Sequence, residues 1–98
     1  MSERIPSHLD SGVANLLGEA PPGGVVKRSV NIAGHRTSVS LEQAFWTSLQ
    51  AIARAERTTI TALITAVDIH RDHGEGNLSS ALRVFCLRWT QARAGRNN

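Results

Sequence analysis

Two short runs in which apolar and polar residues alternate constrain the fold of this chain most. The first run covers residues 25–32 and the second covers residues 36–41. A period of two residues is typical of a strand that buries one face. Ala33-Gly34-His35 separates the runs, and Gly34 supplies a turn conformation that other residues avoid. The pattern predicts two short strands that could form a hairpin, and because a lone two-stranded ribbon is marginal in water, other elements must cover its apolar face.

A helical pattern follows the second run without a linker. Apolar residues recur at helical spacing from residue 42 to about 55, which predicts an amphipathic helix. Ser40 and Gln43 have the spacing of a capping box at its start. The residues of the predicted apolar stripe are Leu41, Phe45, Leu49, Ile52 and Ala53.

Two more helices are predicted downstream. Threonine is a good N-cap, so the cluster at positions 58, 59 and 61 indicates the start of a second helix from about Thr59 to His70. Residues 72–77 contain two glycines and read as a loop. A third helix then begins at Leu78, capped by Asn77 or Ser79, with Cys86 on its apolar side.

The chain divides into three parts. Its 98 residues suffice for one small domain. Pro21-Pro22 and Gly23-Gly24 are breaker clusters, so residues 1–24 are predicted to be a flexible arm, residues 25–92 the folded domain and residues 93–98 a polar tail.

Charge is distributed unevenly along the chain. Residues 27–41 contain three basic residues and no acid, residues 77–98 contain four basic residues and no acid, and the two remaining segments are each acidic. The net charge of +3 is therefore the sum of basic and acidic stretches that largely cancel. Basic stretches are most often solvated faces, so charge alone leaves open whether the partner is a polyanion, and the order of the elements must decide.

The sequence contains none of the motifs that would indicate an enzyme. There is no glycine loop that would cradle a phosphate, no nucleophile with a matching base and no carboxylate pair in an apolar setting. We therefore expect neither a catalytic residue nor a cofactor. His70 and His73 lack the further ligands of a zinc site, so no metal is expected. The single cysteine, Cys86, agrees with a cytoplasmic location, and no apolar run approaches the length of a membrane span.

The order of these elements resembles the ribbon-helix-helix family of DNA-binding proteins, of the Arc and MetJ type. The matching segments are Arg36-Thr37-Ser38-Val39-Ser40-Leu41-Glu42, residues 45–56 and Arg57-Thr58-Thr59-Ile60-Thr61-Ala62-Leu63-Ile64. A larger set of segments looks like a subfamily with an extra N-terminal strand and a C-terminal third helix. These are Lys27-Arg28-Ser29-Val30, Gly34-His35-Arg36-Thr37-Ser38-Val39 and Asn77-Leu78-Ser79-Ser80-Ala81-Leu82-Arg83-Val84-Phe85. The position that the family often fills with glycine in the turn between its helices is Arg57 here.

The resemblance implies a mainly α fold with a short β-ribbon, assembled as an intertwined homodimer. Two copies would pair the strand at 36–41, and their helices would share one core. Higher-order assembly on DNA is possible, and whether the third helix packs on its own chain or on the partner stays open. The implied dimer-core residues are Val39, Leu41, Phe45, Leu49, Leu63 and Val67.

The resemblance also implies a transcriptional regulator, most simply a repressor, that inserts the ribbon into the major groove of double-stranded DNA. The implied base-contacting residues are Arg36, Ser38 and Ser40, and phosphates would be held at the N-terminus of the second helix. The implied phosphate-contacting residues are Lys27, Arg28, His35, Arg57, Thr58, Thr59 and Thr61.

Two alternatives stay open. Lys27, Ser29 and Asn31 give the first run an equally polar face, but the second run is preferred as the reader of DNA because it joins the first helix without a linker, as the family requires. The alternative function is an adaptor or antitoxin-like module that binds a partner protein.

Overall fold

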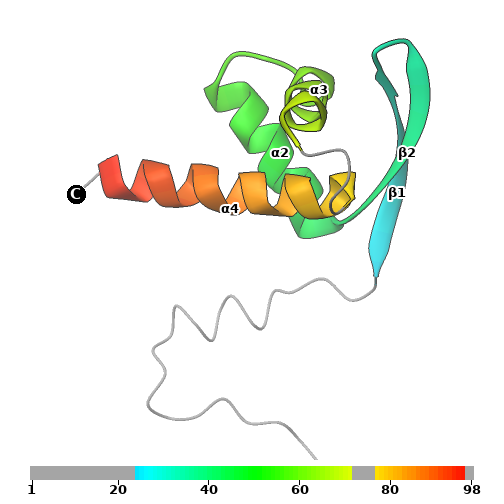
Figure 1. Ribbon diagram of the computed structural model, residues 1–98. Coiled ribbons are helices and arrows are strands. Elements are labelled where there is room, and N and C mark those ends of the chain that lie inside the picture. The colour runs from blue at the N-terminus through cyan, green and yellow to red at the C-terminus, as the bar shows by residue number, and fades with distance from the viewer. Residues whose placement is uncertain (1–23, 72–76, 97–98) are drawn as a thin grey trace, which may run out of the picture.

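The computed structural model describes residues 24–71 and 77–96. All but the last residue of the predicted arm at 1–24, most of the 72–77 loop and residues 97–98 of the predicted tail lie outside the described residues. A β-hairpin stands beside three helices (Figure 1). The prediction of a mainly helical chain with a short ribbon and a third helix is confirmed. The elements are β1 (Val25–Ile32), β2 (His35–Glu42), α2 (Gln43–Ala55), α3 (Ile60–His70) and α4 (Leu78–Arg96).

The hairpin is closed by a turn of two residues. Ala33 and Gly34 have φ values of 51° and 83°, and positive φ at both central residues is what a type I′ turn requires. Such a turn matches the right-handed twist of the strands and fixes their register, in which Ile32 pairs with His35 and Val25 with Glu42. The two strands therefore form the hairpin that the sequence allows but does not require.

The strand at 36–41 finds a partner in its own chain. The resemblance implies pairing with a second copy, but β1 occupies one edge of β2 along its whole length. The tight turn makes this pairing local, so its loop-closure entropy is small. A single chain therefore completes a two-stranded ribbon.

The helices cover the apolar face of the hairpin. Trp46 of α2 is 2% exposed, and its indole N–H donates to the carbonyl of Val26 at 2.9 Å, which ties the first helix to β1. Three predicted dimer-core residues already lie in this single-chain core, and Phe45, Leu63 and Val67 are half-buried against it. The core consists of Val30, Ile32, Val39, Leu41, Trp46, Leu49, Ile52, Ile64, Leu82 and Cys86.

The predicted N-caps are confirmed at two of the three helices. The Thr59 hydroxyl accepts from the N–H of Ala62, and the Asn77 side chain accepts from the N–H of Ser80, so both are N-caps. The capping box of Ser40 and Gln43 is wrong. The strand continues through Glu42, which becomes the N-cap of α2 without a side-chain hydrogen bond, and the Gln43 amide donates to Thr47 instead.

Two polar contacts attach α4 to the end of the hairpin. The Ser79 hydroxyl donates to the Ser40 carbonyl at 2.7 Å, and Arg83 forms an ion pair of 2.9 Å with Glu42. The third helix thus packs on its own chain. It also runs through Arg96, so residues 93–96 of the predicted polar tail are helical, because no helix breaker precedes Gly95.

Replacing Ala33 with asparagine should stabilise the protein. Asparagine tolerates positive φ better than alanine, and Asn-Gly is the preferred type I′ pair. We expect Ala33→Asn to raise the free energy of unfolding by about 1 kcal/mol in urea denaturation. Gly34→Ala should lower it by a similar amount through backbone strain alone, since nothing lies within 4 Å of the added methyl. An unchanged midpoint for both variants would contradict the turn assignment.

The ion pair of Glu42 should give the fold a component of acid sensitivity. Hydrogen bonding from Arg83 lowers the pKa of Glu42 below its ordinary value of 4.5, with a bond from its own backbone N–H as the next cause. A pKa lowered by folding stabilises the fold above about pH 4.5, and this contribution is lost as the pH falls through the folded-state value. We therefore expect Arg83→Gln to flatten the pH dependence of stability in that window, measured by denaturation at several pH values. An identical slope in wild type and variant would refute this contribution.

Candidate nucleic-acid interface

The register of the hairpin brings the polar residues of both strands onto one face. Lys27 lies opposite Ser40, Ser29 opposite Ser38 and Asn31 opposite Arg36. Because side chains alternate across a strand, all six point away from the apolar face that the helices cover. We call this surface, made of Lys27, Ser29, Asn31, Arg36, Ser38 and Ser40, the polar hairpin face.

This face is open and basic. Five of its six residues are exposed, and Ser40 is half-buried where its carbonyl accepts from Ser79. Lys27 and Arg36 provide two positive charges. The nearest acid along the chain, Glu42, is held by Arg83. The three predicted base-contacting residues and Lys27 are thus brought together on one surface.

Arg28 and His35, two of the predicted phosphate contacts, belong to the opposite face of the hairpin by strand alternation. The Arg28 guanidinium carbon lies 5.1 Å from the centroid of the Trp46 ring, a cation–π arrangement that covers the indole. His35 is exposed beside the turn. Both are accessible at the margins of the hairpin, but neither shares the polar hairpin face.

The remaining predicted phosphate contacts form a second cluster at the start of α3. Arg57, Thr58, Thr59 and Thr61 are all exposed there. A helix N-terminus offers unpaired N–H groups and a positive dipole end, which favour an anion. The Thr59 hydroxyl is occupied as the N-cap, so the hydroxyls of Thr58 and Thr61 are the more available ligands.

Arg57 performs the role that glycine often has in this turn. Its φ is 59°, and the N–H of Thr58 donates to the carbonyl of Ala53 at 2.8 Å while the N–H of Arg57 donates to Arg54. This pair of bonds is a Schellman motif, which requires a left-handed residue after the helix. The turn geometry is therefore kept despite the missing glycine, at a cost in backbone strain.

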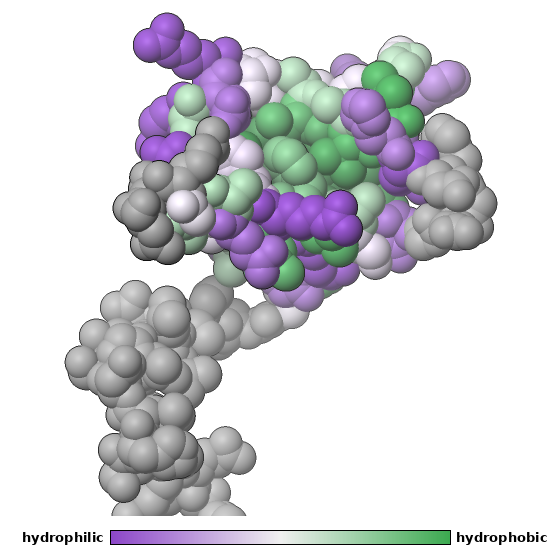
Figure 2. Space-filling view, turned by 60° about the vertical axis from the view of Figure 1, so that its left-hand side comes forward, coloured by the Kyte–Doolittle hydropathy of each residue, from purple (hydrophilic) through white to green (hydrophobic). Residues whose placement is uncertain are grey.

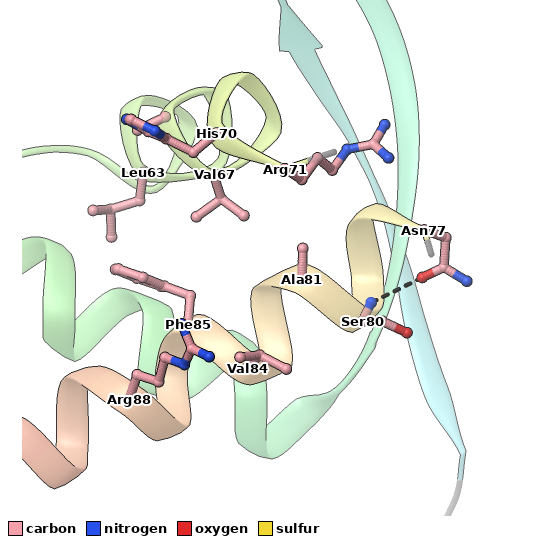
Figure 3. Close-up of a pocket in the computed structure, with 11 residues that line it drawn as sticks. Leu63, Val67, His70, Arg71, Asn77, Ser80, Ala81, Val84, Phe85 and Arg88 are labelled. Carbon is pink, nitrogen blue, oxygen red and sulfur yellow. Dashed lines mark hydrogen bonds between the residues drawn. The ribbon is translucent and has the colours of Figure 1, made fainter. Parts of the chain in front are cut away.

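A groove runs between α3 and α4. Leu63 and Val67 of α3 point toward Phe85 of α4, and Val84 lies at its margin (Figure 3). The groove has a volume of about 730 Å³, and a second groove of about 370 Å³ beside Leu87 separates α4 from α2. Figure 2, which turns the left side of Figure 1 forward, shows a broad apolar area bordered by hydrophilic residues.

Two parts of this surface do not follow from the sequence. The sequence shows that each strand has a polar side, but it does not show how the two strands align. It therefore assigns base contacts to the second strand alone and gives none to Ser29 or Asn31. The register follows only from the two-residue turn. The apolar grooves are the second part. Val84 is 48% exposed and Leu87 is 56% exposed at these grooves, and neither belongs to the apolar side that the sequence predicts for the third helix.

Two further observations concern other kinds of site. Among residues 24–71 and 77–96, no group of three potential metal-ligating side chains comes together. In the same part of the chain, no helix combines the length and apolarity needed to cross a membrane.

Comparison with known proteins identifies the family. The ribbon-helix-helix domain model matches residues 25–90, and the chain therefore belongs to the ribbon-helix-helix family. The chain is similar to the solved structure of an uncharacterized protein from Bordetella pertussis Tohama I. The two are 33% identical with a TM-score of 0.68, and the match covers 88% of this chain and 73% of the other. A search of curated proteins finds no match. Members of the family are usually DNA-binding regulators.

Arg57→Gly should separate the role of the turn from that of its side chain. Glycine removes the strain of a positive φ, so we expect the free energy of unfolding to rise by up to about 1 kcal/mol. Arg57→Ala is the matched control, because it removes the same charge but keeps a Cβ at the same φ. If urea denaturation shows no difference between the two variants, the turn is not strained.

Proposed function

We propose that this protein is a sequence-specific DNA-binding regulator, acting as a repressor in the cytoplasm. The observation that supports this most is the polar hairpin face, which is mostly exposed and basic and whose neighbouring acid, Glu42, is paired with Arg83. A two-stranded ribbon fits the major groove, and the helices behind the hairpin hold its shape. Ribbon-helix-helix proteins usually bind DNA, which agrees with this use of the face.

The side chains on this face suit base recognition. The guanidinium of Arg36 can donate two hydrogen bonds to guanine, whereas Ser38 and Ser40 are short donors and acceptors that discriminate bases weakly. Lys27 would contact a phosphate at the edge of the groove. The cluster at the start of α3 and the marginal Arg28 and His35 would bind phosphates along the flanking backbone.

We further propose that two copies associate through the apolar faces of α3 and α4. In a single chain, an apolar area on these helices is exposed to water. It consists of the half-buried residues Leu63, Val67 and Phe85 and the exposed residues Val84 and Leu87. A second copy is the occupant because family members usually dimerise, and because a self-complementary apolar face is what a twofold interface needs. A dimer would present two polar hairpin faces to DNA.

Substitutions on the polar hairpin face should separate base recognition from phosphate binding. Arg36→Ala should weaken binding to the preferred sequence by about 1–3 kcal/mol and relax the preference at one base pair. Lys27→Ala should weaken binding to all sequences and reduce the salt dependence of the association constant. Fluorescence anisotropy with the duplex upstream of the protein's own gene, at two salt concentrations, measures both effects.

The same titration distinguishes this function from the alternative. Retention of the duplex by wild type, with loss of preference in Arg36→Ala, supports DNA recognition by the hairpin. If wild type retains no duplex even at low salt, the regulator proposal fails and a protein-binding adaptor is favoured.

Charges on the α3/α4 surface should abolish the dimer. We expect wild type to sediment at twice the chain mass of 10.6 kDa, and the double variant Val84→Glu, Leu87→Glu to sediment as a single folded chain. Ile69→Glu is the matched control, because Ile69 is a 68% exposed apolar residue of α3 that lines neither groove. A wild type of single-chain mass, or a dimeric double variant, would contradict this interface.

A further inference from the structure

Asn31 of β1 and Arg36 of β2 are direct neighbours across the hairpin. They are paired in register, one position farther from the turn than the closing pair, Ile32 and His35. Facing residues in an antiparallel ladder alternate between hydrogen-bonded and non-hydrogen-bonded pairs. The pair that closes a two-residue turn is hydrogen-bonded. Asn31 and Arg36 therefore form the closer, non-hydrogen-bonded kind, whose Cα atoms are about 4.5 Å apart. Their side chains leave the same face side by side.

Neither side chain has a partner in the part of the chain that the structure describes. Both residues are exposed. Several other arginines of the described chain are engaged: Arg28 lies over Trp46, Arg71 pairs with Asp68, Arg83 pairs with Glu42 and Arg93 lies over Trp89. Arg36 has no such contact among the described residues, so its donors remain available to an outside ligand.

The two side chains have complementary preferences for bases. The amide oxygen of an asparagine accepts from the N6 amino group of adenine while its N–H donates to N7, which matches the major-groove edge of that base. An arginine guanidinium matches O6 and N7 of guanine. Farther from the turn, Ser29 pairs with Ser38 and Lys27 with Ser40, so only the pair beside the turn joins a side chain that suits adenine to one that suits guanine.

We propose that β1 reads DNA together with β2, with Asn31 recognising an adenine next to the guanine that Arg36 recognises. This inference rests on the proposed function and assigns a specificity-determining residue to the strand that precedes the family's usual reading strand. Each chain then recognises a step of two adjacent base pairs through one cross-strand pair. Ser29 and Ser38 contribute little preference of their own.

The test is selection of bound duplexes from a random-sequence library with the full chain, followed by competition titrations. Wild type should select a motif that contains adjacent adenine and guanine. Asn31→Ala should lose discrimination at the adenine by roughly tenfold to a hundredfold and keep the guanine. Arg36→Ala should show the reverse. Asn31→Gln should retain a preference for adenine, because glutamine offers the same amide.

Gln50→Ala provides the control, since Gln50 is an exposed residue of α2 and not part of the hairpin, and the substitution should leave the motif unchanged. If wild type selects a motif and Asn31→Ala selects the same one, or loses affinity equally for all sequences, the reading role of Asn31 is overturned while the proposed function stands. If wild type selects no motif and binds no duplex, the proposed function itself fails.

Discussion

The two-residue turn at Ala33-Gly34 is the constraint on which the rest of the structure depends. Two consecutive residues of positive φ set the strand register. A slip of one residue would exchange the two faces of a strand and place Val39 and Leu41 in water. With the register fixed, one face of the hairpin packs on Trp46 and the helices, and the other collects the polar residues of both strands. The register set by this turn thus determines both which side chains enter the core and which form the candidate interface.

The charges of the chain acquire distinct roles in this arrangement. The basic residues of the ribbon divide between the polar hairpin face, where Lys27 and Arg36 are exposed, and the opposite face, where Arg28 covers Trp46. The basic third helix is partly structural, because Arg83 neutralises Glu42 and attaches α4 to the hairpin. The net charge therefore understates the positive potential on the face that would meet DNA.

Much of the fold could be predicted from the sequence, because alternation in the strands and helical spacing after them are local patterns. The N-cap Thr59 followed from the same local chemistry, which also gave Asn77 as one of two candidate caps for the third helix. Features that depend on strand pairing and register could not be predicted. Ser40 and Gln43 fit a capping box by spacing, but cross-strand pairing carries β2 through Glu42. The alternation allows a hairpin but does not set its register, so the position of Asn31 beside Arg36 follows only from the two-residue turn. Whether the proposed site residues bind DNA stays a prediction.

Amide chemical-shift mapping tests most directly whether the hairpin is the surface that binds DNA. The full chain, labelled with ¹⁵N, would be titrated with a duplex recovered by selection from a random library. We predict that the largest shifts fall on residues 27–31 and 36–40, with smaller shifts at residues 57–61 and none in the buried part of α2. Shifts confined to α3 and α4, with the hairpin unaffected, would contradict the account.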